Sequence, residues 1–191
     1  MAEQSGTFSL AAESALPTDE TPLAVGTVLR VLPPRALVRL QIPRRLIPQA
    51  GSLQVGTTTL PTTPGRCAGE EPVALWLAPD GWLLLSEVRN GAALAAEVRR
   101  HCDERSVAAV DVSDSLVVFE LTGPLTRELL ARGTAVDLAD ETLTRGRCTR
   151  LRFAQLAVIL RPHDAERVEL IVDRGPAAWL RDWFIDAGKL L

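Results

Sequence analysis

The segment 73–86 constrains the fold of this chain more than any other part of the sequence. Two runs of strand-forming residues, Val-Ala-Leu-Trp-Leu-Ala and Trp-Leu-Leu-Leu-Ser, flank a Pro-Asp-Gly sequence at 79–81. Such runs around a tight turn predict a β-hairpin. Asn90 then provides an N-cap for a helix predicted over residues 90–102, with apolar residues four apart on one face. We therefore expect antiparallel strands that pack beside a helix.

The rest of the chain repeats this alternation of strands and helices. Gly123-Pro124 begins a second predicted helix that ends at Gly133, since proline suits the first turn and glycine the end. The other predicted strands cover residues 26–31, 36–42, 53–60, 107–112, 116–121, 149–154, 156–160 and 167–172, and a last helix covers 176–187. This order predicts an α+β fold with mostly antiparallel sheets and about three helices packed on one side.

The distribution of residue types along the chain also predicts its domain organisation. Residues 1–22 are rich in Ser, Thr, Ala and Glu, and Pro17 and Pro22 interrupt any helix. We expect these residues to form a flexible arm, or to become ordered against a partner. Residues 23–191 are predicted to form a single α+β domain. The recurring strand-strand-helix unit leaves open a division into two small lobes, 23–122 and 123–191.

Composition and charge argue against several classes of function. The chain has 47% hydrophobic and 24% charged residues among its 191, a balance typical of globular domains. Its net charge of −3 provides no positive field for a phosphate backbone, so nucleic-acid binding is not expected. The apolar runs are too short to span a membrane. The first residues contain neither a basic region nor an apolar signal segment, so we predict a cytoplasmic protein.

The residues that usually carry catalysis are scarce and scattered. The three cysteines are an odd number with no C-x-x-C pair, which argues against a disulfide framework and a compact zinc site. Lys189 is the only lysine, and the two histidines, His101 and His163, have no good ligand near them in sequence. Neither a G-x-G-x-x-G nor a Walker motif is present. We therefore predict no catalytic, cofactor-binding or metal-ligating residue in this chain.

Two groups of residues are candidates for contact with a ligand or a partner. Asp111, Ser113 and Asp114 place carboxylates and a hydroxyl at one turn, where they either hold a small polar ligand or satisfy backbone N–H groups. Trp179 and Trp183 lie one turn apart on the last predicted helix. Large aromatic residues often anchor interfaces, but they also fill cores. The sequence leaves both readings open for each group.

An ordered series of segments resembles the gamma-subunit family of heterotetrameric sarcosine oxidase across residues 73–187. The segments that carry the resemblance are 74–85, 110–115, 121–124, 128–133, 136–138, 146–149, 170–174 and 179–184. The same series resembles, more distantly, the folate-binding aminomethyltransferases of the glycine-cleavage system, in which an Asp-Val-Ser strand also precedes a Gly-Pro helix start. The resemblance implies an α+β fold similar to that of these folate-binding proteins.

The resemblance also implies a function. It places the chain in a complex with alpha, beta and delta subunits, where those partners carry FAD, FMN, NAD and tetrahydrofolate. The complex would oxidise sarcosine or a related N-methyl amine and reduce oxygen to peroxide, and the gamma subunit would pack on the alpha chain without a cofactor. Relatives with folate-linked chemistry carry a Lys-Gly-Cys-Tyr type of motif, whereas this chain has Arg145-Gly-Arg-Cys148. A similar fold does not transfer folate binding.

Two other functions remain as alternatives at this point. The first is a stand-alone folate-binding module or an aminomethyltransferase-like protein, suggested by the turn at 111–115 beside the Gly123-Pro124 helix start. The second is an interaction scaffold unrelated to sarcosine, with Trp179 and Trp183 as its anchors.

Overall fold

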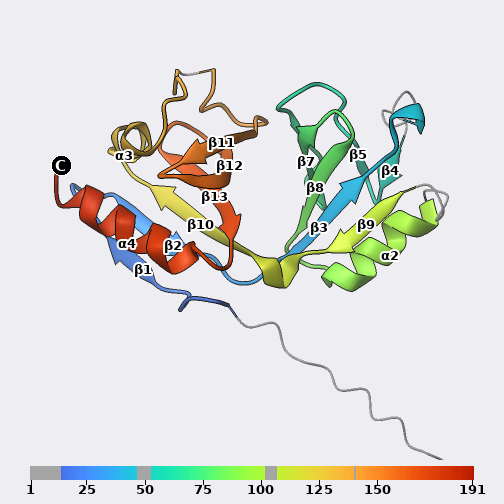
Figure 1. Ribbon diagram of the computed structural model, residues 1–191, viewed down its shortest axis with the longest axis horizontal. Helices are drawn as coiled ribbons and strands as arrows, with labels where there is room; N and C mark the ends of the chain where they lie inside the picture. The colour runs from blue at the N-terminus through green and yellow to red at the C-terminus, as the bar shows by residue number, and fades with distance from the viewer. Residues whose placement is uncertain (1–13, 47–52, 102–106, 140) are drawn as a thin grey trace, which may run out of the picture.

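Two antiparallel β-sheets form the middle of the molecule, and helices cover their outer faces (Figure 1). The computed structural model describes residues 14–46, 53–101, 107–139 and 141–191. Within these residues the layers follow the order helix, sheet, sheet, helix. The predicted α+β class with mostly antiparallel sheets and three α-helices is confirmed.

The first sheet, which we call sheet A, has six strands in the order β1-β2-β10-β13-β12-β11. Its strands are β1 (Glu20–Pro22), β2 (Val28–Val31), β10 (Leu116–Thr122), β13 (Arg167–Asp173), β12 (Leu156–Pro162) and β11 (Thr149–Phe153). The second sheet, sheet B, has five strands in the order β6-β7-β8-β3-β9. They are β6 (Cys67–Ala68), β7 (Val73–Ala78), β8 (Gly81–Ser86), β3 (Ala36–Gln41) and β9 (Ala108–Asp111). A separate short hairpin pairs β4 (Gln54–Val55) with β5 (Thr58–Thr59).

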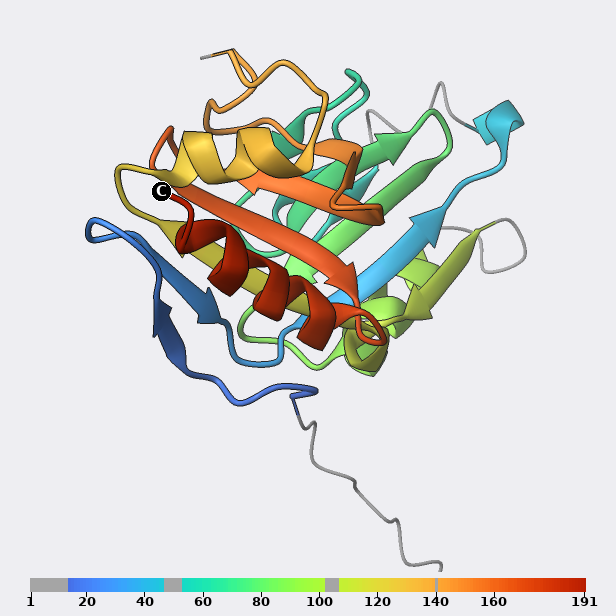
Figure 2. The same cartoon turned by 60° about the vertical axis from the view of Figure 1, so that its left-hand side comes forward.

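The helices lie on both outer faces of this pair of sheets (Figures 1 and 2). Helix α2 (Gly91–His101) packs against sheet B, and helices α3 (Thr126–Gly133) and α4 (Ala177–Gly188) pack against sheet A. Two short 3-10 helices, η1 (Arg44–Leu46) and η2 (Ser113–Ser115), lie in connections. The helices do not all pack on one side, as was predicted, because each of the two sheets is covered by helices on its own outer face.

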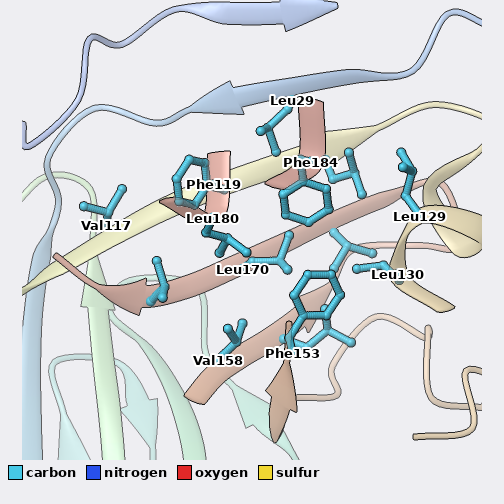
Figure 3. Close-up of a cluster of buried hydrophobic side chains, with 14 of the residues drawn as sticks. Leu29, Val117, Phe119, Leu129, Leu130, Phe153, Val158, Leu170, Leu180 and Phe184 are labelled. Atoms are coloured by element: carbon cyan, nitrogen blue, oxygen red, sulfur yellow. The ribbon is translucent and has the colours of Figure 1, made fainter. Parts of the chain in front are cut away.

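Three apolar layers hold these elements together, and alternate residues of a strand point into different layers. Phe119 of β10 faces α3 and α4, whereas its neighbour Val118 faces sheet B. Trp82 of β8 likewise faces α2, and Leu83 faces sheet A. Figure 3 shows the largest layer, between sheet A and its helices, where many aromatic and aliphatic side chains converge. The central strands are therefore apolar on both faces.

The chain crosses between the sheets twice. The positions of these crossings differ from the predicted division of the chain into lobes. Residues 32–35 lead from sheet A to sheet B, and η2 leads from β9 of sheet B back to β10 of sheet A. The predicted strands 107–112 and 116–121 therefore do not pair with each other. The possible lobes 23–122 and 123–191 also do not coincide with the two sheets. Strand β10, at the end of the first lobe, pairs along its whole length, from Leu116 to Thr122, with β13 of the second.

The predicted arm 1–22 extends too far along the chain. Residues 20–22 form β1, which pairs with β2, and Leu16 is buried in the layer beneath α4. Apolar contact and strand pairing order this segment within the chain itself. Residues 1–13 lie outside the described residues.

Gly133, at the end of α3, gives a direct test of the packing between α3 and sheet A. A Cβ added there would lie 2.3 Å from the ring of Phe153. That ring has no exposed surface, and it stacks on Phe184 with the ring centroids 5.3 Å apart. We expect Gly133→Ala to lower the free energy of unfolding by about 1–3 kcal/mol, as overpacked cores do.

Chemical denaturation followed by circular dichroism measures this change. Gly175→Ala is the matched control, because a Cβ there meets nothing within 4 Å. Equal stabilities of the two variants would contradict the predicted packing.

Candidate functional site

A large polar cavity opens between the ends of the two sheets. Its volume is about 890 Å³. The walls come from β6 and the loop after it, from the ends of β7, β8 and β12, and from the segment 145–146. The charged and thiol side chains that line it are Cys67, Glu70, Glu71, Glu87, Arg145, Arg161 and His163. We refer to this space as the inter-sheet cavity.

Glu169 lies just behind one wall of the inter-sheet cavity and is almost completely buried, with 1% of its surface exposed. Two guanidinium groups bind its carboxylate. Arg161 Nη1 lies 2.8 Å from Oε2, and Arg35 Nη1 lies 2.9 Å from Oε1. Arg35 also lies 3.2 Å from Glu87, which follows β8, so this arginine connects sheet A to sheet B.

His163 completes the surroundings of Glu169. Its Nε2 atom lies 3.3 Å from Oε1 of Glu169, and among the described residues this buried nitrogen has no hydrogen-bond partner. Burial raises the pKa of Glu169, but the imidazole of His163 and the guanidinium groups of Arg161 and Arg35 outweigh it, and the pKa falls to about 2. The carboxylate is therefore ionised at neutral pH.

The opposite wall of the inter-sheet cavity is acidic. Glu71 accepts hydrogen bonds from the Ser86 hydroxyl and from the backbone N–H of Glu87, the latter at 3.2 Å. The guanidinium of Arg89 lies 3.7 Å from the same carboxylate. Glu70 and Glu87 are exposed. Carboxylates that follow β6 and β8 and the basic side chains of Arg145 and Arg161 thus line the same cavity.

Two thiols meet at the floor of the inter-sheet cavity. Cys67 begins β6 and is half-buried, whereas Cys148 precedes β11 and is buried. A β-bridge between Arg66 and Arg147 brings the two cysteines together, although they are far apart in sequence. The Cys67 thiol donates to the carbonyl of Arg147 at 3.2 Å, and the Cys148 thiol contacts the carbonyl of Trp76 at 3.3 Å.

The predicted turn residues Asp111, Ser113 and Asp114 lie at the crossing from sheet B to sheet A, away from the inter-sheet cavity. Asp111 Oδ1 accepts hydrogen bonds from the backbone N–H and the hydroxyl of Ser113, at 3.0 and 2.5 Å. The Ser113 hydroxyl oxygen in turn accepts from the N–H of Leu37 at 3.0 Å. These side-chain oxygens bind backbone groups of the crossing. Asp114 is exposed.

The helix start at Gly123 is occupied by the chain itself. The hydroxyl of Thr27 accepts a hydrogen bond from the N–H of Leu125 at 3.1 Å. A Cβ at Gly123 would lie 2.6 Å from Cα of Thr27, so only glycine fits beside that backbone. The amide of Leu125, which immediately precedes α3, is therefore bound by another part of the chain.

The two tryptophans of α4 differ in their surroundings. Trp179 keeps 49% of its surface exposed. Trp183 contacts the rings of Phe153 and Phe184 edge to face, with centroids 5.1 and 5.2 Å apart. A hollow of about 430 Å³ lies beside them. Its lining, which we call the α4 face, is Arg132, Trp179, Asp182, Trp183, Asp186, Ala187 and Leu190.

The described part of the chain contains no group of three or more His, Cys, Asp or Glu side chains that could hold a metal ion. Among the described helices, none is long and apolar enough to cross a membrane.

Comparison with known proteins assigns the family. The model of the sarcosine oxidase gamma subunit family matches residues 49–189. The chain belongs to this family. The match begins earlier than residue 73, where the sequence resemblance began, and so it includes the thiol of Cys67 and the acidic wall of the inter-sheet cavity.

Solved structures share the fold of this gamma-subunit family member. A chain of the heterotetrameric sarcosine oxidase from Corynebacterium sp. U-96, solved with pyrrole 2-carboxylate, matches with a TM-score of 0.75 and 21% identity. The match covers 87% of each chain. The aminomethyltransferase T of the glycine cleavage system from Bartonella henselae matches with a TM-score of 0.59 and 16% identity. That match covers 82% of this chain and 45% of the other. No curated protein matches the sequence.

The residues of the inter-sheet cavity were missed by the sequence analysis of this family member. A glutamate in the middle of the apolar run 168–172 is a signal that could have marked Glu169. No local pattern could have paired Cys67 with Cys148, because the contact depends on a bridge between distant segments. His163 has no good ligand near it in sequence, but in the fold it lies against Glu169.

The low pKa of Glu169 predicts a dependence of stability on pH. Its pKa is about 2 in the folded chain and about 4.3 in an unfolded one, so the ionised carboxylate stabilises the fold above the unfolded value. We expect Glu169→Gln to lower the free energy of unfolding by about 3 kcal/mol at pH 7. The difference from the parent chain should shrink as the pH falls from about 5 towards 2.

Urea denaturation at several pH values measures this difference. Glu87→Gln is the control, because Glu87 shares Arg35 but is 62% exposed and should contribute less than about 1 kcal/mol. A difference for Glu169→Gln that does not change with pH would contradict the assignment.

Proposed function

We propose that this chain is a non-catalytic gamma subunit of a heterotetrameric sarcosine oxidase. The complex would oxidise sarcosine or a related N-methyl amine and reduce oxygen to peroxide. The observation that carries the proposal is the family match over residues 49–189. The similar fold of a chain from the Corynebacterium enzyme supports it.

The proposal assigns the redox cofactors to other subunits. We propose that alpha, beta and delta chains hold FAD, FMN, NAD and tetrahydrofolate, and that the predicted domain 23–191 acts as one structural unit together with strand β1 of sheet A. The shared apolar layer between the sheets, to which Leu83 and Val118 contribute, supports a single unit. We further propose a cytoplasmic complex, since an odd number of cysteines without a disulfide framework suits a reducing compartment.

The alternative of a folate-binding module has less support. The oxygens of Asp111 and Ser113 are used by the crossing between the sheets, and Thr27 occupies the start of α3. The likeness to aminomethyltransferase T, at 16% identity, concerns the fold.

Reconstitution tests the subunit assignment. We expect the purified chain to be colourless and to consume no oxygen with sarcosine. When it is expressed with the larger subunits, it should co-purify with flavin-bearing chains that do consume oxygen. Omission of this chain should reduce the yield of the assembled complex. Turnover of sarcosine by the isolated chain would overturn the proposal.

We propose that the α4 face binds the alpha subunit, and that Trp179 is its anchor. Half of this large side chain is exposed, and Asp182 and Asp186 flank it. Aromatic residues at the centre of an interface contribute strongly to binding. Asp182 pairs with Arg181 and Asp186 with Lys189, so charged groups of both signs surround Trp179 as a polar rim.

The variant Trp179→Ala separates binding from folding. We expect it to weaken capture of the alpha subunit at least tenfold, equivalent to about 1.4 kcal/mol or more, while the thermal midpoint changes little. Trp183→Ala should lower that midpoint, because Trp183 packs on Phe153 and Phe184. Pull-down titration and thermal unfolding measure the two effects.

Val110→Ala is the control for loss of an exposed apolar side chain elsewhere. Val110 lies on β9, at the other end of the molecule from α4 (Figure 1), and is 55% exposed. Equal affinity of the Trp179→Ala variant and the parent chain would exclude Trp179 as the anchor.

A further inference from the structure

We propose that Cys67 and Cys148 form a peroxide-reactive dithiol at the floor of the inter-sheet cavity, and that oxidation closes it to a disulfide. The oxidant belongs to the class of small hydroperoxides. The bond would join the start of β6 in sheet B to the residue before β11 in sheet A, and so would link the two sheets covalently.

The backbone brings the two cysteines together. Around the bridge between Arg66 and Arg147, the N–H of Cys67 donates to Gly146 and the N–H of Cys148 donates to Gly65, both at 2.9 Å. The two cysteines each lie one residue beyond the bridged pair. Their side chains therefore point to the same face of this short antiparallel ladder.

The sulfur contacts agree with this placement, because each sulfur reaches the peptide that precedes the other cysteine. The Sγ atom of Cys67 lies 3.2 Å from the carbonyl oxygen of Arg147, and that of Cys148 lies 3.6 Å from the carbonyl oxygen of Arg66. Both sulfurs therefore converge on the bridged pair Arg66 and Arg147, and the proposed disulfide would close across it.

Of the two cysteines, Cys67 is the one that an oxidant in the inter-sheet cavity can reach. Cys67 lines the inter-sheet cavity, which at about 890 Å³ admits a peroxide molecule easily. Cys148 is 1% exposed and lies behind Cys67 in the apolar layer between the sheets. The order of reaction follows, since Cys67 meets the oxidant and Cys148 is in place to resolve the product.

The surroundings favour one thiolate in the pair. The neighbouring Cys67 thiol lowers the pKa of Cys148. Burial opposes this, while the Trp76 backbone and the charges of Arg161 and Arg147 assist it. The neighbouring Cys148 and burial raise the pKa of Cys67, so the two protons leave in separate steps. For Cys67 to react first, its proton must pass to Cys148, which places the negative charge on Cys67 at the cavity.

The chemistry balances with hydrogen peroxide as the oxidant. The Cys67 thiolate attacks one peroxide oxygen, an S–O bond forms, the O–O bond breaks, and the leaving hydroxide takes a proton to become water. Cys148 then attacks the sulfur of the sulfenic acid, an S–S bond forms, and the oxygen leaves as a second water. Two thiols lose two electrons, and one peroxide gains them.

The reactivity does not depend on the proposed function. A sarcosine oxidase that reduces oxygen to peroxide would supply an oxidant of this class. The test below adds hydrogen peroxide directly to the isolated full-length chain, so its outcome is independent of any partner subunit.

The experiment uses the full-length chain and its Cys102→Ser variant, which leaves Cys67 and Cys148 as the only thiols. We expect stoichiometric peroxide to remove both titratable thiols from this variant and to lower its intact mass by two hydrogen atoms. Peptide mapping without reductant should find Cys67 linked to Cys148, in the parent chain also. Dithiothreitol should restore both thiols.

Single variants in the same background test the order of reaction. Cys148→Ser should accumulate a sulfenic acid on Cys67 that dimedone traps, and Cys67→Ser should react at least tenfold more slowly. Serine is close in size to cysteine, and circular dichroism checks that both variants fold.

Three results would overturn the proposal. The first is survival of both thiols under conditions that oxidise free glutathione, and the second is conversion of Cys67 to a sulfonic acid without a disulfide. The third is equal reactivity of the two single variants, which would contradict the one-sided access. The map of the parent chain decides the first two even if a variant fails to fold.

Discussion

The apolar layer between the two sheets is the constraint on which the rest of this structure depends. Because sheet A and sheet B press face to face and each also carries helices, the central strands must be apolar on both sides. The run Trp82-Leu83-Leu84-Leu85 satisfies this requirement, since alternate residues enter different layers. The twist of the two sheets and the two crossings of the chain then set the limits of this apolar layer. Polar side chains can be placed beyond those limits.

Charged residues replace apolar ones at the edge of that layer. One row of charged residues crosses sheet A, with one residue from each of five neighbouring strands. In the order of strand pairing, the row is Glu20 of β1, Arg30 of β2, Glu120 of β10, Glu169 of β13 and Arg161 of β12. The only neighbours of like charge are Glu120 and Glu169, both buried, and each binds arginines on its other sides. Buried carboxylates of this kind are tolerable only when their partners remain in place. The row therefore favours one register of the strands, and its last member, Arg161, lines the inter-sheet cavity.

The two candidate functional surfaces lie on different parts of the molecule. The α4 face lies outside sheet A and presents Trp179 beside two aspartates, which suits contact with another subunit. The inter-sheet cavity lies between the sheets and holds opposed charges and a pair of thiols. A subunit built in this way would bind its partner through one face and keep a chemically reactive space on another. The family assignment and the arrangement of these surfaces are consistent with each other.

The sequence by itself determined the local elements and the family. The hairpin 73–86 and the helices predicted at 90–102 and 176–187 agree with the structure to within one or two residues at each end, because turn residues, caps and apolar spacing are local signals. Tertiary structure alone decided that β9 and β10 belong to different sheets and that helices cover both outer faces. It also decided that Cys67 meets Cys148. These outcomes depend on which distant segments share an apolar layer or a backbone bridge, and no short stretch of sequence specifies such a pairing.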